Sequence, residues 1–190
     1  MRTVTNDKIF TKEEYIQHEL HAETRSEFIN GQLFIMPGEK DINNKIAFLL
    51  AMFLYQSLNS KGYSIFSHDI KIGIPGENCF YYPDVFATRE ERKEENQYIK
   101  YEPEIIIEVV SPSSQITDSV DKYIDYTKIP SLKYYLIVEP ETILITVYER
   151  TVGSQWEARK FTKLNEFVAL DQLGLSFLVS DIYQDVLNVH

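Results

Sequence analysis

The stretches FYYPDVFAT (residues 80–88) and EIIIEVVSP (residues 104–112) each place one acidic residue, Asp84 or Glu108, among residues typical of a buried strand. A carboxylate in an apolar strand costs several kcal/mol unless a proton, hydrogen bonds or a cation compensates it. Two such acids on separate strands can converge on one cation. The pair therefore indicates a metal site on a β-sheet.

Each acid taken alone has another explanation. The strand around Glu108 is apolar on both faces, as in an interior strand, and a structural ion pair would also account for its acid. Asp84 follows Pro83, a pair that is common in turns, although Pro83 also favours an extended backbone before it and suits a strand edge or bulge. The strand-like flanks and the presence of a second acid favour the functional interpretation.

Periodicity predicts the helices and turns of the N-terminal half. Thr11 and Glu14 have capping-box spacing and predict a helix over 11–25. The Asn30-Gly31 pair predicts a β-hairpin. Apolar residues at three- and four-residue intervals predict a core helix over 41–59. Strands are expected over residues 64–74, 80–88, 104–110, 134–138, 143–150 and 156–161.

A helix is also expected from a Ser113-Ser114 cap to about Lys128. Its apolar stripe would lie against the sheet and consists of Ile116, Val120, Tyr123, Ile124 and Thr127. With the strand before it and KYYLIVEP (residues 133–140) after it, this helix predicts a crossover unit in a mixed sheet. Residues 143–150 would add an antiparallel neighbour, and the apolar tail at 174–187 would pack back onto the domain.

Composition sets the broad class of the protein. With 190 residues, 44% of them hydrophobic, the chain predicts one globular domain over 1–190. Its one cysteine excludes an internal disulfide, and its four histidines lack zinc-ligand spacing. The N-terminal residues lack the apolar core of a signal peptide and no later run is long enough to span a membrane, so a cytoplasmic protein is expected.

The distribution of charge limits the interpretation as a nucleic-acid-binding protein. A net charge of −10 argues against broad, nonspecific attraction to nucleic acid, so binding would need a local basic surface. The mixed-sign run at 89–104 predicts a solvated loop or a frayed helix. Asp118 and Lys122, four residues apart and off the apolar stripe, would on periodicity alone form a surface salt bridge.

Five segments taken in order resemble one family: EFINGQL (residues 27–33), YYPDVFA (81–87), IIIEVVSPSS (105–114), DSVDKYIDY (118–126) and KYYLIVEP (133–140). Together they resemble the Uma-two family of restriction-endonuclease-like proteins, within the PD-(D/E)xK nuclease superfamily. The resemblance covers roughly residues 10 to 180. It implies an α/β (α+β) fold in which helices flank a mixed β-sheet core, and a metal-dependent DNA endonuclease.

The resemblance also implies roles for residues. Asp84 and Glu108 would be metal-binding carboxylates, the Val109 carbonyl would help to hold the ion, and Glu27 would match an additional N-terminal acid. Val110 stands where the superfamily motif has lysine, so Lys122 resembles a lysine that has moved to the following helix, where Asp118 would be its companion. Such oxygen ligands suit Mg²⁺ or Mn²⁺.

A second departure from the family pattern is Asn43, at a place where many relatives have histidine. An amide can form hydrogen bonds but cannot act as a general base near neutral pH. Three interpretations follow: a DNA endonuclease, a binding or regulatory module with a nuclease fold and no turnover, and a structural domain in which Asp84, Glu108 and Lys122 form only a buried polar network. A homodimer is expected if both strands of a duplex are cut.

Overall fold

Two parallel strands, β9 (Pro103–Val109) and β10 (Tyr134–Glu139), form the centre of a six-stranded sheet in the computed structural model. The structure describes all residues except 1–2, 5–7, 37, 95–96, 111–115 and 188–190. The sheet has the order β12-β11-β10-β9-β7-β4, and its other pairs are antiparallel. Its remaining strands are β4 (Ser64–Ser67), β7 (Val85–Thr88), β11 (Leu144–Arg150) and β12 (Trp156–Phe161). The sheet is mixed, as predicted.

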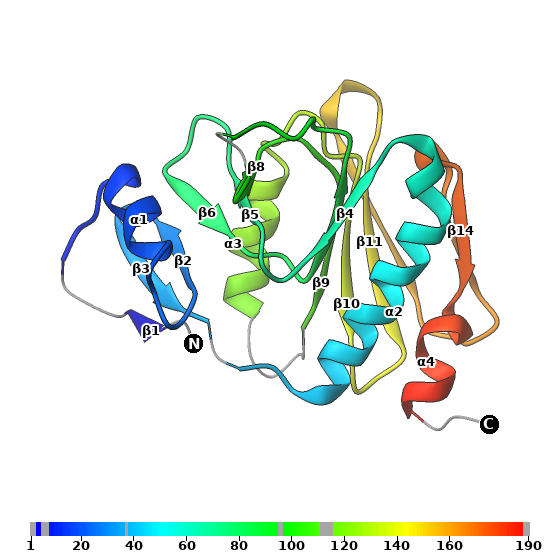
Figure 1. Ribbon diagram of the computed structural model, residues 1–190. Helices are drawn as coiled ribbons and strands as arrows, with labels where there is room; N and C mark the ends of the chain where they lie inside the picture. Colours follow the sequence, from blue (N-terminus) through cyan, green and yellow to red (C-terminus); the bar gives the residue numbers. More distant parts are fainter. Residues whose placement is uncertain (1–2, 5–7, 37, 95–96, 111–115, 188–190) are drawn as a thin grey trace.

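Helices cover both faces of this sheet (Figure 1). The helices α2 (Asp41–Leu58) and α4 (Val179–Leu187) pack on one face with the small sheet of β13 (Phe167–Leu170) and β14 (Leu175–Leu178). The helix α3 (Ile116–Tyr126) lies on the other face and connects β9 to β10, which confirms the predicted crossover. No helix in the described ranges has the length and apolar character needed to cross a bilayer.

A second six-stranded sheet, in the order β1-β3-β2-β6-β5-β8, joins the N-terminal region to the centre of the molecule. Its strands are β1 (Thr3–Val4), β2 (Ser26–Ile29), β3 (Gln32–Ile35), β5 (Lys71–Gly73), β6 (Cys79–Tyr81) and β8 (Ile99–Lys100). The helix α1 (Lys12–Glu19) packs its buried Tyr15 against Phe28 and Phe80 of this sheet. Figure 1 shows this part beside α3 and across the molecule from α4.

The capping box and the turn near the N-terminus form as predicted, but α1 ends at Glu19, so the helix expected over 11–25 is shorter than predicted. The Glu14 N–H donates to Thr11 Oγ1 over 3.1 Å, and the Thr11 N–H donates to Glu14 Oε2 over 2.9 Å, which completes the capping box of α1. Asn30 and Gly31 have φ values of 50° and 89° and connect β2 to β3 in the tight turn that this pair favours.

Two predicted strands are each broken near the middle, which corrects the expectation of continuous strands over 64–74 and 80–88. The first divides into β4 and β5 around His68, whose φ of 58° lies in the left-handed region. The second divides into β6 and β7 at Tyr82-Pro83-Asp84, where Pro83 has no N–H for a sheet ladder. The breaks leave His68 directly after β4 and Asp84 directly before β7.

The predicted orientation of α3 is correct for Tyr123, which packs against Tyr135 and Tyr148 of the sheet, but wrong for other residues of the stripe. Val120 and Ile124, assigned from the sequence to the sheet-facing stripe, are 51% and 50% exposed, whereas Lys122 and Tyr126 are buried. Buried carboxylates opposite Lys122 compensate its charge and make this orientation favourable. The proposed Ser113-Ser114 cap and the side chain of Asp118 lie outside the described residues.

Most of the charged run at 89–104 is the solvated loop that its composition predicted, since residues 89–94 and 97–98 lie outside strands and are mostly exposed, but the end of the run is buried in two strands. Glu104 is buried on β9 and binds Arg89 and Lys133, with its Oε1 2.7 Å from Arg89 Nε and its Oε2 2.6 Å from Lys133 Nζ. Lys100 is buried on β8. The charges at the C-terminal end of this run therefore pair within the fold, because the buried Glu104 has cations from two other segments beside it.

Candidate functional site

Asp84 and Val109 connect the ends of two neighbouring strands. Asp84 directly precedes β7, and its Oδ2 accepts the backbone N–H of Val109 over 2.6 Å. The β7–β9 register pairs Val85 with Ile107, and the same register continued by one residue brings Asp84 opposite Glu108. The two acids singled out in the sequence therefore meet where β9 ends.

Lys122 joins Glu108 to an acid from the other large sheet. Its Nζ lies 3.2 Å from Oε1 of Glu108 on β9 and 2.9 Å from Oε1 of Glu27 on β2. The Tyr126 hydroxyl, one turn further along α3, donates to Glu108 Oε1 over 2.9 Å. All four side chains are buried. The structure therefore brings together Asp84, Glu108, Lys122 and Glu27, each of which the family motifs had singled out.

Burial dominates the electrostatics of the two strand acids. Burial raises the pKa of Glu108, and the charges of Asp84 and Glu27 raise it further, while Lys122 opposes the shift. Burial also raises the pKa of Asp84, with Glu39 acting in the same direction and the Val109 N–H opposing it. A cation at this place would stabilise the charged form of both acids.

A group that the sequence motifs missed lies beside Asp84. Glu39, His68 and Asp84 each offer one ligand atom, and these atoms all lie within 4.8 Å of one another. His68 Nδ1 is 3.8 Å from Glu39 Oε1 and 3.9 Å from Asp84 Oδ1. These residues come from three separate segments, so no local spacing could have revealed the cluster.

Asn43, in the first turns of α2, approaches the same strand end. Its Nδ2 donates to the Val109 carbonyl over 3.2 Å. The amide therefore forms the hydrogen bond that its chemistry allows and holds one of the predicted metal-ligand oxygens. Val110, at the position of the superfamily lysine, donates its N–H to the Val138 carbonyl over 3.0 Å. It continues the β9–β10 pairing rather than offering a charged group.

The chemistry of the donor groups fits a divalent cation. Carboxylate and carbonyl oxygens are the ligands that Mg²⁺ and Mn²⁺ prefer, and imidazole binds transition metals more readily than Mg²⁺. Asp84 belongs to both the predicted ligand set (Asp84, Glu108 and Val109) and the cluster with Glu39 and His68. With an ammonium group held on the Glu108 side, the arrangement can bind a cation and an anionic substrate group next to each other.

Comparisons with known proteins show the family of the chain. The Uma2 (Uma-two) family model, described as "Putative restriction endonuclease", matches residues 12–180. The protein sll1609 of Synechocystis sp. (strain ATCC 27184 / PCC 6803 / Kazusa) is 32% identical over 158 residues, covering 82% of this chain and 89% of its own. The protein slr1290 of the same strain is 30% identical over 173 residues, covering 90% of each chain.

A solved structure has the same fold. The crystal structure of a protein from Anabaena variabilis ATCC 29413, described as "a putative nuclease belonging to DUF820", superposes with a TM-score of 0.76 and 17% sequence identity. The match covers 92% of this chain and 98% of that one. The predicted fold class, a restriction-endonuclease-like mixed sheet flanked by helices, is confirmed.

Proposed function

Because the chain belongs to the Uma2 family of restriction-endonuclease-like proteins, we propose that it is a metal-dependent endonuclease that hydrolyses phosphodiester bonds of DNA. The observation that carries the proposal is the position of Lys122, whose Nζ lies 2.9 Å from Glu27 Oε1 and 3.2 Å from Glu108 Oε1. A buried ammonium group beside strand-end carboxylates suits the hydrolysis of a phosphodiester, in which negative charge develops on the phosphate.

The proposed ligands of the ion are Asp84, Glu108 and the Val109 carbonyl, and Glu39 and His68 could complete the set. Mg²⁺ or Mn²⁺ held there would supply Lewis-acid activation of the phosphate and of an attacking water. Asp84 also fixes the backbone of Val109 through its 2.6 Å hydrogen bond. Asn43 holds the carbonyl of the same residue from the other side.

Lys122 is the residue proposed to stabilise the developing charge on the phosphate. Glu27 and Glu108 hold its ammonium group in place, and Tyr126 in turn holds Glu108 through a 2.9 Å hydrogen bond. A preorganised charge in a site largely shielded from water needs little rearrangement during the reaction, which is the basis of electrostatic catalysis. Glu27 is thus proposed to position Lys122.

The proposal includes an assembly and a location. We propose that residues 1–190 act as one nuclease domain, since the site gathers residues from Glu27 to Lys122 and the family match spans 12–180. Cutting both strands of a duplex requires two such sites, which favours a homodimer. We also propose that the protein acts in the cytoplasm, on DNA present there.

Cleavage assays with matched variants test the proposal. Supercoiled plasmid and single-stranded circular DNA would be incubated with the protein and Mg²⁺ or Mn²⁺, with and without a chelator. The wild type should nick or linearise at least one substrate, and the chelator, Glu108→Gln and Lys122→Ala should each abolish or strongly reduce this activity. Glu141→Gln, which changes an exposed acid paired with Lys40, is the control. Equal cleavage by Glu108→Gln would refute the proposed site.

The second candidate is a nuclease-fold module that binds nucleic acid without cleaving it. It is favoured by Val110 and Asn43, which stand where the family pattern has lysine and histidine, and by the 3.2 Å hydrogen bond that Asn43 makes to the proposed ligand carbonyl of Val109. Binding of DNA with no cleavage under any metal condition would select this candidate.

A further inference from the structure

A cavity of about 500 Å³ lies beside β4, away from the candidate metal site. Its volume is within the range of small-molecule sites. Aromatic and cationic side chains form much of its wall: Tyr55, Tyr63, Phe66, Tyr98, Arg92 and Lys100. The lining of the cavity also includes Glu90. The cavity thus has two cations and one acid in its lining, in a protein whose net charge is −10.

Lys100 is a buried cation without a hydrogen-bond acceptor. It is 3% exposed, and its Nζ has no hydrogen-bond partner among the residues that the structure describes. The nearest acid, Glu90, has Oε1 3.9 Å away, while its Oε2 accepts the backbone N–H groups of Tyr101 and Glu102 over 2.7 and 3.0 Å. A buried ammonium group with donors to spare favours a ligand that brings a negatively charged oxygen.

Two tyrosines supply exposed aromatic surface at the same cavity. Tyr55 and Tyr98 are each 57% exposed, and neither ring contacts another ring within the described ranges. Tyr63 differs, because its hydroxyl donates to Glu104 over 2.8 Å and its ring lies under Arg89. Exposed rings next to a buried cation suit a ligand that has both a planar aromatic part and an anion. A nucleotide has both.

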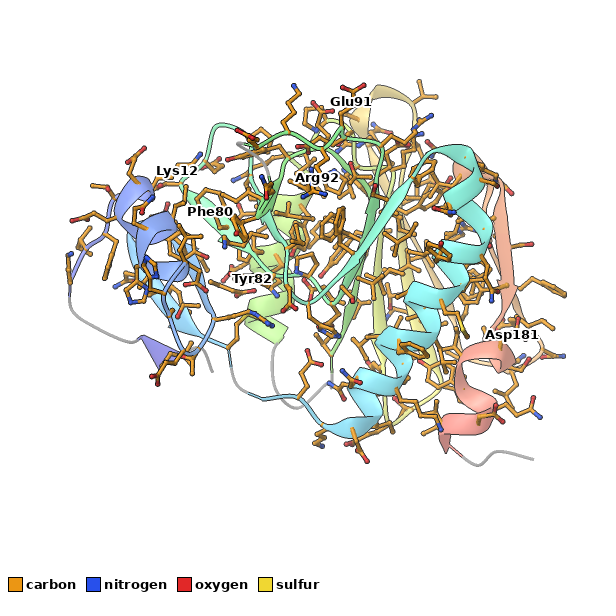
Figure 2. The ribbon with its side chains drawn as sticks, viewed as in Figure 1. Lys12, Phe80, Tyr82, Glu91, Arg92 and Asp181 are labelled. Carbon is orange, nitrogen blue, oxygen red and sulfur yellow. The ribbon has the colours of Figure 1, made fainter. Side chains whose placement is uncertain are left out.

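The elements that line the cavity also lead to the candidate metal site. Strand β4 contributes Ser64 and Phe66 to the cavity, and it ends at Ser67, directly before His68. Helix α2 carries Asn43 at its start and Tyr55 near its end, and twelve helical residues correspond to about 18 Å. In Figure 2, Arg92 lies in the upper part of the view, whereas Tyr82, two residues before Asp84, lies lower, beside α3.

An exposed aromatic residue lies between the two ends of this path. Phe48 of α2 is exposed and precedes Tyr55 by seven residues, a spacing that places both on one helix face. A nucleic-acid strand that passes along α2 and β4 would therefore meet aromatic surface before it reaches the cavity. Stacking of bases on aromatic rings along a strand is how proteins bind unpaired nucleic acid.

We propose that this cavity binds an unpaired nucleotide of the nucleic-acid substrate, at a distance from the bond that is cut. The base stacks against Tyr98 or Tyr55, and the phosphate pairs with Lys100 and Arg92. The inference rests on the proposed function because it takes the ligand to be DNA. It does not require that the protein cleaves that DNA. It predicts that the protein prefers DNA with at least one unpaired base to fully paired DNA.

The test is binding of a fluorescent single-stranded DNA of about 12 nucleotides, followed by anisotropy in a chelator so that no cleavage occurs. Tyr98→Ala and Lys100→Met should each weaken binding about 10-fold relative to wild type. Phe167→Ala removes an aromatic side chain of β13 that is 64% exposed and outside the cavity lining, and it should bind as wild type does. Arg92→Gln replaces Lys100→Met if the latter does not fold.

Two further measurements show which part of the ligand the cavity binds and whether the ligand is a strand or a free nucleotide. A strand of the same length with abasic sites should bind wild type about as weakly as Tyr98→Ala binds the normal strand. Deoxyadenosine monophosphate should compete only weakly if the cavity is built for a strand. Equal binding by wild type, Tyr98→Ala and Lys100→Met, no binding by wild type, or binding of the free nucleotide alone would each overturn the inference.

The outcome is separable from that of the proposed function. Binding that depends on Tyr98, in a protein that never cleaves DNA with any metal, would uphold the cavity and refute the endonuclease. Metal-dependent cleavage, together with binding that Tyr98→Ala and Lys100→Met leave unchanged, would support the endonuclease and refute the nucleotide site in the cavity.

Discussion

Lys122 Nζ lies 2.9 Å from Glu27 Oε1, and this contact connects the two large sheets of the protein. Glu27 belongs to β2 of one sheet, while the second partner of the lysine, Glu108, belongs to β9 of the other. One ammonium group on α3 therefore compensates two buried carboxylates. Removal of the lysine should affect both stability and catalysis.

Lys122→Met should lower the free energy of unfolding by about 3 kcal/mol at pH 7, since it leaves two buried acids without their cation. Lys128→Met is the matched control on the same segment, because Lys128 pairs with Asp125 and Glu77 at a more exposed place and should contribute about 0.5 kcal/mol. Urea denaturation of both variants measures the difference. Equal losses would contradict the buried bridge.

Glu27→Gln should reduce cleavage about 10- to 100-fold, in the range found for residues that orient a catalytic or metal-binding group. The amide keeps the shape of the side chain but holds the ammonium group of Lys122 less firmly. Glu27→Asp, which keeps the charge, should recover part of the activity. Single-turnover rates together with Mn²⁺ affinity separate this role from ligation: the rate should fall while the affinity stays close to wild type. A parallel loss of affinity would make Glu27 a ligand.

The orientation of α3 predicts opposite effects for two substitutions. Ile124→Gln should change the free energy of unfolding by less than about 0.5 kcal/mol because the side chain is half exposed. Tyr126→Phe should cost about 1–3 kcal/mol, since it removes the hydroxyl that donates to the buried Glu108. Thermal or urea unfolding of the two variants measures both effects. A large loss for Ile124→Gln would instead support the apolar stripe predicted from the sequence.

Glu104 should make stability depend on pH in the acid range. Burial acts to raise the pKa of Glu104, but hydrogen bonds from Arg89, Lys133 and Tyr63 outweigh it, and the pKa is lowered. The unfolded state therefore binds the proton more readily, so this stabilisation is present above about pH 4.3 and is lost as pH falls through the lowered value.

The measurement is the urea midpoint of wild type and Glu104→Gln from pH 7 to pH 3. The difference between them should be large at pH 7 and should shrink below about pH 4. The exposed pair of Glu141 and Lys40 supplies the control, Glu141→Gln, for which only a small difference is expected. A difference for Glu104→Gln that stays constant across this range would contradict the role of its charge.

The sequence revealed the parts of the site that depend on short-range patterns. Asp84 and Glu108 were found because each acid interrupts an apolar strand, and Lys122 because the family motifs place a lysine on the following helix. The family assignment is confirmed by the match over 12–180. The helical periodicity of the apolar residues predicted that Lys122 lies on the surface. That prediction assumes that only apolar side chains are buried.

Other features depend on contacts between distant segments. His68 approaches Asp84 where the predicted strand 64–74 breaks, at a positive φ that the sequence did not indicate, and Glu39 joins them from the segment before α2. The same holds for the cavity, where Lys100 lies in a charged run that composition assigned to solvent. In both cases the residues that come together lie on different elements, so the local sequence pattern does not indicate their contact.

The most direct test of the central claim is Mn²⁺ binding by calorimetry to the folded wild type and to Asp84→Asn, because Asp84 belongs to both sets of proposed ligands. Saturable binding by the wild type that is lost in Asp84→Asn and kept in Glu141→Gln is the predicted result. Binding of equal affinity by Asp84→Asn and wild type would contradict the assignment of a metal centre at the end of β9.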